Sequence, residues 1–137
     1  MALKISLKPH ERMIIGGAVV KNGNKVVELF IENNVTILRE KDIINEAGAN
    51  TPCKRIYFII QLMYIDGGKS ADYQNSYDEL VRDLVAAAPS TATLVARINE
   101  AISAGKLYHA LKLARQLIDY EDGLIRLAQV NPEFTPQ

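Results

Sequence analysis

The chain has 137 residues, of which 48% are hydrophobic and 23% are charged, and its 16 basic side chains balance 16 acidic ones. This composition is typical of one folded domain or of two small units, and it excludes an extended disordered chain. No apolar run reaches the ~18 residues of a membrane-spanning helix and the first residues lack the apolar stretch of a secretory signal, so we expect a cytoplasmic protein with no membrane partner.

Residues 1–48 have the pattern of a small antiparallel sheet. Hydrophobic and polar residues alternate over 3–8, as in a strand with one solvated face. Further short apolar runs follow at 13–15, 18–20, 26–31 and 35–38. Because Asn22-Gly23 is typical of a tight hairpin turn, we expect the run at 26–31 to return beside 18–20. The pattern predicts a β-meander of four to five strands, which needs a partner surface for stability.

The pattern becomes helical after Gly48. Thr51 and Pro52 are suited to the N-cap and first position of a helix, and the residues of 56–65 are apolar nearly all round, as in a buried helix. Two or three amphipathic helices are predicted to follow before 130, which gives three to four helices in all. The sequence therefore predicts an α+β protein, with a strand region over 1–48, a helical region over 49–130 packed on it, and a frayed tail over 131–137.

Motifs that would indicate catalysis or cofactor binding are incomplete. Gly67-Gly68-Lys69-Ser70 resembles the end of a phosphate-binding loop, but Met63 stands where that loop needs a glycine. The single cysteine has no evident catalytic partner and excludes an internal disulfide, which fits a reducing compartment. The two histidines, His10 and His109, are far apart in the sequence. We therefore expect no enzyme activity, no metal site and no cofactor.

Three separated blocks carry a resemblance to a known family. They are LKISLKPHERMIIGGAVVKNG, VTILREKDI with the following TPCKRIYFIIQLMYID, and GKLYHALKLARQLIDYED. In this order and spacing they resemble the FlbT family of bacterial flagellum-biosynthesis repressors, over residues 1–125. The resemblance implies a post-transcriptional regulator that associates with the 5′ untranslated region of flagellin mRNA and promotes its decay or represses its translation. It also implies FlaF, a second small flagellar regulator, as a possible partner.

An RNA site would need Lys and Arg side chains to neutralise phosphates. Residues 1–55 carry nine basic and six acidic side chains, whereas residues 56–137 carry seven and ten. The candidate RNA-binding residues are therefore in the first part of the chain: Lys4, Lys8, Arg39, Lys41, Lys54 and Arg55. If the first and last strands are adjacent, Lys4, Lys8 and Arg39 form one basic strip. The same side chains equally fit solvated strand edges that discourage aggregation.

The strand region bears a second resemblance. ERMIIGG, the Asn-Gly turn and VTILREKDI are together similar to the CsrA family of mRNA-binding translational repressors. That family holds a single-stranded GGA with its first and last strands, using a basic residue at the position that Arg39 would match. The present sequence is shorter between its second and third strands, and it has Asn33-Asn34 in place of an Ala-Pro-type turn.

The alternative function is a protein-interaction module or a flagellin-directed chaperone that acts through the helical region. The candidate partner-binding residues are Tyr73, Tyr77, Asp119, Glu121 and Asp122. Acidic helices suit a basic or apolar partner such as FlaF or flagellin, although the helical spacing of the tyrosines equally fits core packing. A homo-oligomer is compatible with either function.

Overall fold

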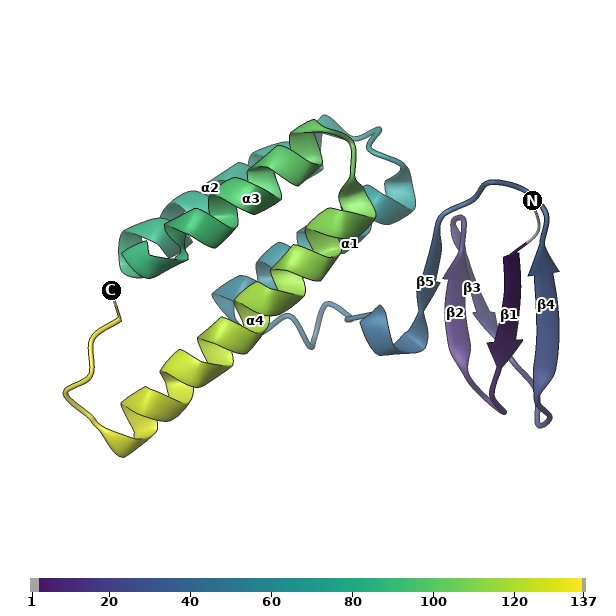
Figure 1. The fold of residues 1–137 in the computed structure, drawn as a ribbon, viewed down its shortest axis with the longest axis horizontal. Coiled ribbons are helices and arrows are strands. Elements are labelled where there is room, and N and C mark those ends of the chain that lie inside the picture. The colour runs from purple at the N-terminus through teal and green to yellow at the C-terminus, as the bar shows by residue number, and fades with distance from the viewer. Residues whose placement is uncertain (1–2, 137) are drawn as a thin grey trace. The chain divides into compact units, whose positions relative to one another are not determined.

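A computed structural model describes residues 3–136 of the chain. Over these residues, five strands are followed by four α-helices, which confirms the α+β class (Figure 1). The chain divides after Ile43 into two compact units. We call them the strand unit and the helical unit and describe each by itself.

The strands of the strand unit form two antiparallel sheets. They are β1 (Leu3–Leu7), β2 (Arg12–Ile15), β3 (Ala18–Lys21), β4 (Val27–Ile31) and β5 (Ile37–Arg39). β1 pairs with β4, while β2 lies between β3 and β5. The order differs from a simple meander, because only β2 and β3 pair as neighbours in the sequence. Ile5, Leu7 and Met13 form the buried core between the strands.

The tight hairpin of this unit is at Gly16-Gly17 and not at Asn22-Gly23. Ile15 pairs with Ala18, which leaves a two-residue loop in which Gly16 has a φ of +59°. The Asn22 amide instead donates to the carbonyl oxygens of Leu7, Lys8 and Lys25, at 3.3, 2.8 and 2.7 Å. These bonds hold the segment after β3 against the end of β1, and β4 then pairs with β1. The expected pairing of 18–20 with 26–31 was therefore wrong.

The helical unit contains four α-helices. They are α1 (Pro52–Asp66), α2 (Ala71–Ala87), α3 (Ala92–Ser103) and α4 (Leu107–Val130), and a 3-10 turn, η2 (Pro89–Thr91), precedes α3. As predicted, the Thr51 hydroxyl accepts a hydrogen bond from the backbone N–H of Lys54, and Pro52 begins α1. Gly67 ends α1 with a φ of +74°, a conformation that a glycine adopts without strain.

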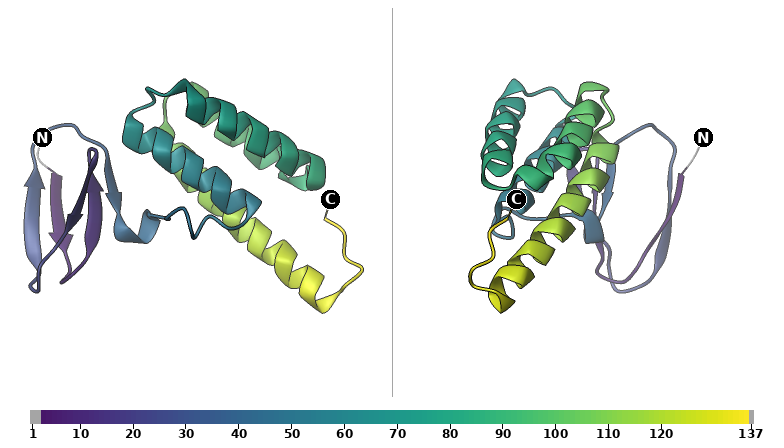
Figure 2. Two further views of the ribbon diagram at one scale, coloured as in Figure 1. Left: turned by 180° about the vertical axis from the view of Figure 1, so that it is seen from behind. Right: turned by 60° about the vertical axis from the view of Figure 1, so that its left-hand side comes forward.

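The helix α1 is the central element of this unit, with α2 packed on one side and α4 on another (Figures 1 and 2). Ile56 and Ile60 on α1, Ile98 on α3 and Leu117 on α4 are completely or almost completely buried. The third neighbouring pair is α3 and α4, whereas α2 and α3 contact one another only slightly. The predicted buried helix over 56–65 is thus confirmed as part of the core of the bundle.

Candidate nucleic-acid interface

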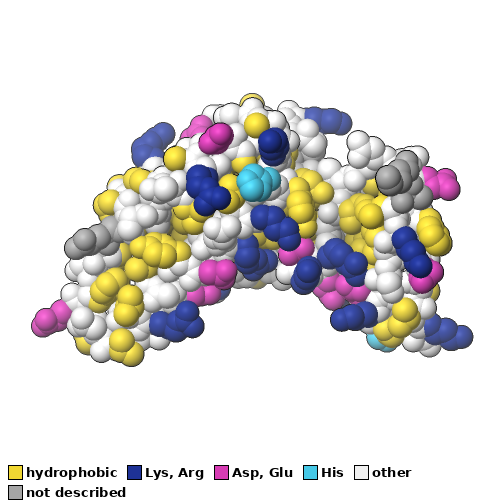
Figure 3. Space-filling view, in the orientation of Figure 1, with side chains coloured by type: hydrophobic (Ala, Val, Ile, Leu, Met, Phe, Trp, Pro, Cys, Tyr) yellow, Lys and Arg dark blue, Asp and Glu magenta, His cyan; other side chains and the backbone are white. Residues whose placement is uncertain are grey.

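The structure distributes the six basic candidates over both units. Lys4 is in β1, Lys8 follows it, Arg39 ends β5 and Lys41 lies in the 3-10 turn η1 (Glu40–Asp42). Lys54 and Arg55 begin α1 in the helical unit, so they do not belong to a site on the strand unit. On the face shown in Figure 3, Lys and Arg side chains of each unit lie among Asp and Glu side chains.

The condition for a basic strip of Lys4, Lys8 and Arg39, pairing of the first and last strands, is not met. β1 and β5 belong to different sheets, because β4 is the strand that pairs with β1. Lys4 lies on the outer face of β1 and forms an exposed ion pair with Glu28 of β4, at 3.3 Å. Lys4 therefore does not join Arg39 in a strip along paired strands.

Three of the candidates instead meet in an open hollow of about 670 Å³ at one end of the strand unit. Its lining consists of Lys8, Pro9, His10, Glu11, Arg39, Glu40 and Lys41. The turn after β1 and the end of β5 supply these residues. Because the two segments are far apart in the sequence, no local pattern indicated that they lie close together. The sequence analysis did not select His10, Glu11 or Glu40 as site residues. The only sequence signal for them is that they lie within the blocks of the resemblance, His10 and Glu11 in LKISLKPHERMIIGGAVVKNG and Glu40 in VTILREKDI.

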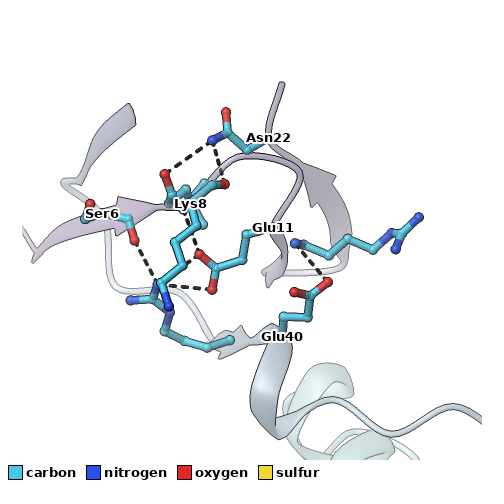
Figure 4. A network of polar contacts seen from close by, with 8 residues as sticks. Ser6, Lys8, Glu11, Asn22 and Glu40 are labelled. Atoms are coloured by element: carbon cyan, nitrogen blue, oxygen red, sulfur yellow. Dashed lines mark hydrogen bonds and ion pairs between the residues drawn. The ribbon is translucent and has the colours of Figure 1, made fainter. Parts of the chain in front are cut away.

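One ion pair in the lining of the hollow joins the end of β5 to the turn after β1. The Arg39 guanidinium donates to the Ser6 carbonyl oxygen at 2.8 Å and contacts the Glu11 carboxylate at 3.3 Å. The backbone N–H of Lys8 donates to the same carboxylate at 2.9 Å, and Figure 4 shows Ser6, Lys8 and Glu11 in this network. The side chain of Glu11 is only 14% exposed, whereas that of Arg39 is 37% exposed. Arg39 is therefore a structural cation with one accessible side.

The hollow holds both signs of charge. The pKa of the Glu11 carboxyl lies below its ordinary value, first because the Lys8 N–H donates to it and further because the Arg39 guanidinium is close. Glu40 accepts a hydrogen bond from the backbone N–H of Arg12 at 3.3 Å (Figure 4). Lys8 and Lys41 are exposed and belong to neither of the two ion pairs found in the described part of the strand unit. They are the cations best placed to contact a bound anion.

The candidate partner-binding residues differ in exposure. Asp119 and Asp122 are exposed on α4, and Tyr73 is half-buried on α2. Tyr77 is completely buried, and its hydroxyl donates to the Asn99 side-chain oxygen at 2.6 Å. Burial also raises the pKa of this tyrosine. The expectation that Tyr77 meets a partner is corrected by its burial, since its ring packs in the bundle core.

Glu121 is likewise buried, and it has a structural role. Its carboxylate accepts hydrogen bonds from the Thr51 hydroxyl and, at 3.1 Å, from the backbone N–H of Cys53. An anion there satisfies N–H groups at the start of α1 and interacts favourably with the helix dipole. Burial, together with the nearby Glu121 carboxylate, raises the pKa of the Cys53 thiol. Neither side chain is available to a partner at the surface.

Residues 3–136 provide neither a cluster of metal ligands nor a helix able to span a membrane. No group of three or more His, Cys, Asp or Glu side chains in this range is placed to hold a metal ion. None of the helices in the same range combines the length and the apolar character needed to cross a membrane.

The family described as "Flagellar protein FlbT" matches residues 3–125 of the chain. The chain belongs to the FlbT family. It is 48% identical over 125 residues to the probable flagellum biosynthesis repressor protein FlbT 1 of Bradyrhizobium diazoefficiens, covering 90% of this chain and 85% of the relative. A probable flagellum biosynthesis repressor protein FlbT of Rhodopseudomonas palustris is 39% identical, over 91% of this chain and 98% of its own length.

A third relative is the flagellum biosynthesis repressor protein FlbT of Caulobacter vibrioides, which is 35% identical over 89% of this chain and 88% of its own length. No solved structure matches the chain. The resemblance drawn from the three sequence blocks is thereby confirmed at the level of the family.

Proposed function

We propose that this protein is a post-transcriptional regulator of flagellum synthesis that associates with the 5′ untranslated region of flagellin mRNA and lowers its stability or translation. Membership of a family whose members are named flagellum biosynthesis repressors supports the flagellar role. The single observation that supports a place for RNA is the hollow with Lys8 and Lys41 at its rim. Decay of the message would then follow from its exposure to the ribonucleases of the cell.

The hollow has features that suit a single-stranded nucleic acid. Its volume of about 670 Å³ lies within the size range of sites for small ligands and leaves room for a nucleotide. Lys8 and Lys41 would neutralise phosphates, and the His10 imidazole offers a flat surface on which an unpaired base can stack. Because Glu11 and Glu40 oppose an anion, we expect modest affinity with a steep dependence on salt.

The first prediction concerns the salt dependence of RNA binding. Titrations of labelled flagellin leader RNA at several salt concentrations should show that Lys8→Ala and Lys41→Ala each lower the slope of log K against log [salt] by roughly 0.7. Lys25→Ala is the matched control, because Lys25 is exposed on the strand unit but does not line the hollow. An unchanged slope in both variants, with folding intact, would place RNA elsewhere.

A groove in the helical unit favours a second candidate function, the docking of a flagellar protein. The space between α2 and α3 is about 380 Å³, and its apolar lining includes Val81, Val85, Val95 and Ile102. The polar side chains of Asp78 and Arg82 lie at the same groove, as expected for a site that takes an amphipathic segment of a partner such as FlaF or flagellin. Hydrophobic side chains also lie at the surface over the C-terminal half of α4 (Figure 3).

One experiment separates the two functions. The protein is captured from cell lysate with and without ribonuclease treatment. RNA binding predicts that flagellin mRNA is recovered from the untreated lysate. It also predicts that the purified protein recovers the same mRNA from RNA extracted from the lysate, from which the other proteins have been removed. Protein docking predicts that FlaF or flagellin is recovered in equal amounts with and without ribonuclease.

A further inference from the structure

The strand β4 has an open edge with an apolar surface. It pairs with β1 on one side, and no other described strand pairs with it. Figure 1 draws it at the outer side of the strand unit. Next to this edge, Val26 is 62% exposed and Phe30 is 61% exposed, and Leu3 across the sheet is 52% exposed. The edge therefore offers unpaired backbone groups beside exposed hydrophobic side chains.

The other edge strands of the two sheets carry the charges that usually discourage pairing. β1 contains Lys4, β3 contains Lys21 and β5 contains Arg39. The sequence of β4, VELFI, has neither a basic residue nor a proline. Lysine, proline and bulges are the common means by which proteins protect an edge strand from pairing with another chain. β4 has no lysine and no proline, and its one charged residue, Glu28, forms an ion pair with Lys4 of β1.

We propose that two copies of this chain pair antiparallel along β4 and form a continuous four-stranded sheet with the order β1-β4-β4-β1. A two-fold axis at Leu29 brings all five residues of β4 into the pairing. Leu29 then lies opposite Leu29 of the second copy, Val27 opposite Ile31, and Glu28 opposite Phe30. Val27, Leu29 and Ile31 already pair with the apolar residues of β1, so the inner face of the enlarged sheet is apolar throughout.

Charge selects this register among those that keep the two inner faces on one side. The apolar, odd-numbered side chains of both copies lie on the same face of the sheet only in a register that places odd residues opposite odd residues. An axis at position 28 would place Glu28 opposite Glu28, and an axis at position 30 would place it opposite Glu32. Like charges directly opposite one another are destabilising. The axis at Leu29 avoids both contacts and also gives the longest overlap.

Cysteine cross-linking tests the register on the full chain. Glu28→Cys and Phe30→Cys alter exposed side chains, and the only native thiol, Cys53, is buried. With Glu28 opposite Phe30, a mixture of the two variants should form a disulfide-linked dimer under mild oxidation, because directly opposite residues have Cα atoms within disulfide range. Each variant alone should remain unlinked, since the diagonal distance is too long.

Dissociation gives a second measurement that does not need a thiol. Phe30→Glu places two carboxylates opposite one another at two symmetric positions, and it should weaken dimerisation roughly tenfold or more in sedimentation experiments. The double change Glu28→Lys with Phe30→Glu restores opposite charges and should recover association. Val19→Glu is the matched control, because Val19 is an equally exposed residue of β3 in the other sheet.

The outcomes divide cleanly. A dimer of twice the chain mass that cross-links only in the mixture supports the proposal. A chain that is monomeric at all concentrations, cross-linking of either variant with itself, or equal effects of Val19→Glu and Phe30→Glu would overturn it. Occupation of the edge by an extended segment of another protein, with the isolated chain monomeric, would also overturn it.

Discussion

Arg39 lies where β5 meets the end of β1, and its guanidinium is engaged by groups of its own chain. It donates to the Ser6 carbonyl oxygen and forms an ion pair with Glu11, so replacing it removes a link between two sheets. An Arg39→Ala variant would thus confuse loss of RNA contacts with loss of structure. Lys8 and Lys41 are better test residues, because their exposed side chains lie outside this link.

The Glu11 carboxylate makes the strand unit sensitive to acid. Its pKa is lowered in the folded chain, so the stabilisation that it provides is complete above its ordinary range and is lost as pH falls through the lower folded value. We predict that Glu11→Gln flattens the fall in melting temperature as the pH drops below 4.5, the ordinary pKa of a glutamate side chain. Glu46→Gln, which changes an exposed carboxyl outside the hollow, is the control. Identical pH profiles for Glu11→Gln and the wild type would contradict this role.

At the scale of elements, α1 connects the other parts of the helical unit. It begins at a cap formed by Thr51 together with the buried Glu121 of α4. Further along α1, the Gln61 side-chain amide accepts a hydrogen bond from the backbone N–H of Ile44 and donates one to its carbonyl oxygen, both at 2.9 Å. These contacts tie the first segment of the unit and the last helix to one element. Packing against α2 and α4 then covers the apolar sides of α1.

Two adjacent isoleucines of α1 should differ in their contribution to stability. Ile60 is completely buried, whereas Ile59 is half-buried. Ile60→Ala should therefore lower the free energy of unfolding by about 2–5 kcal/mol, through lost burial and a residual cavity. Ile59→Ala should cost clearly less, because its environment can relax. Urea unfolding of both variants measures the difference, and equal costs would show that Ile59 is covered by a contact such as an oligomer interface.

At the scale of the whole molecule, the proposed RNA site and the proposed protein site belong to different units. The hollow with Lys8 and Lys41 is in the strand unit, and the groove between α2 and α3 is in the helical unit. Since each unit has its own buried side chains, a surface change in one should leave the other folded. The two activities should then be separable by mutation.

The prediction for the whole molecule uses one variant in each unit. Val85→Asp places a charge in the groove and should abolish co-purification of FlaF or flagellin while leaving the binding of leader RNA unchanged. Ala86→Asp adds the same charge at an exposed position of α2 and is its control. The double change Lys8→Ala with Lys41→Ala should have the opposite pattern. Loss of both activities in each folded variant would indicate one shared surface.

The helices, the Thr51 cap of α1 and the α+β class were determined by local features of the sequence. Thr51-Pro52 begins α1 because a hydroxyl and a proline suit the first turn of any helix, and Gly67 ends it for an equally local reason. The apolar period of each helix also predicted which side is buried. Such signals act within a few residues, so they can be read without knowledge of the fold.

Tertiary structure alone decided which strands pair and which charges meet. The Asn22-Gly23 signal favoured a hairpin, but the Asn22 amide binds the end of β1 and β4 pairs with that strand. Glu11 and Arg39 meet across 28 positions, and Glu121 reaches the N–H of Cys53 across 68. Contacts of this kind depend on which surfaces the folded chain brings together. The residues that lie between the two partners in the sequence do not indicate that the partners will meet. The family could be identified from the sequence, whereas the hollow and the open edge of β4 became visible only in the folded chain.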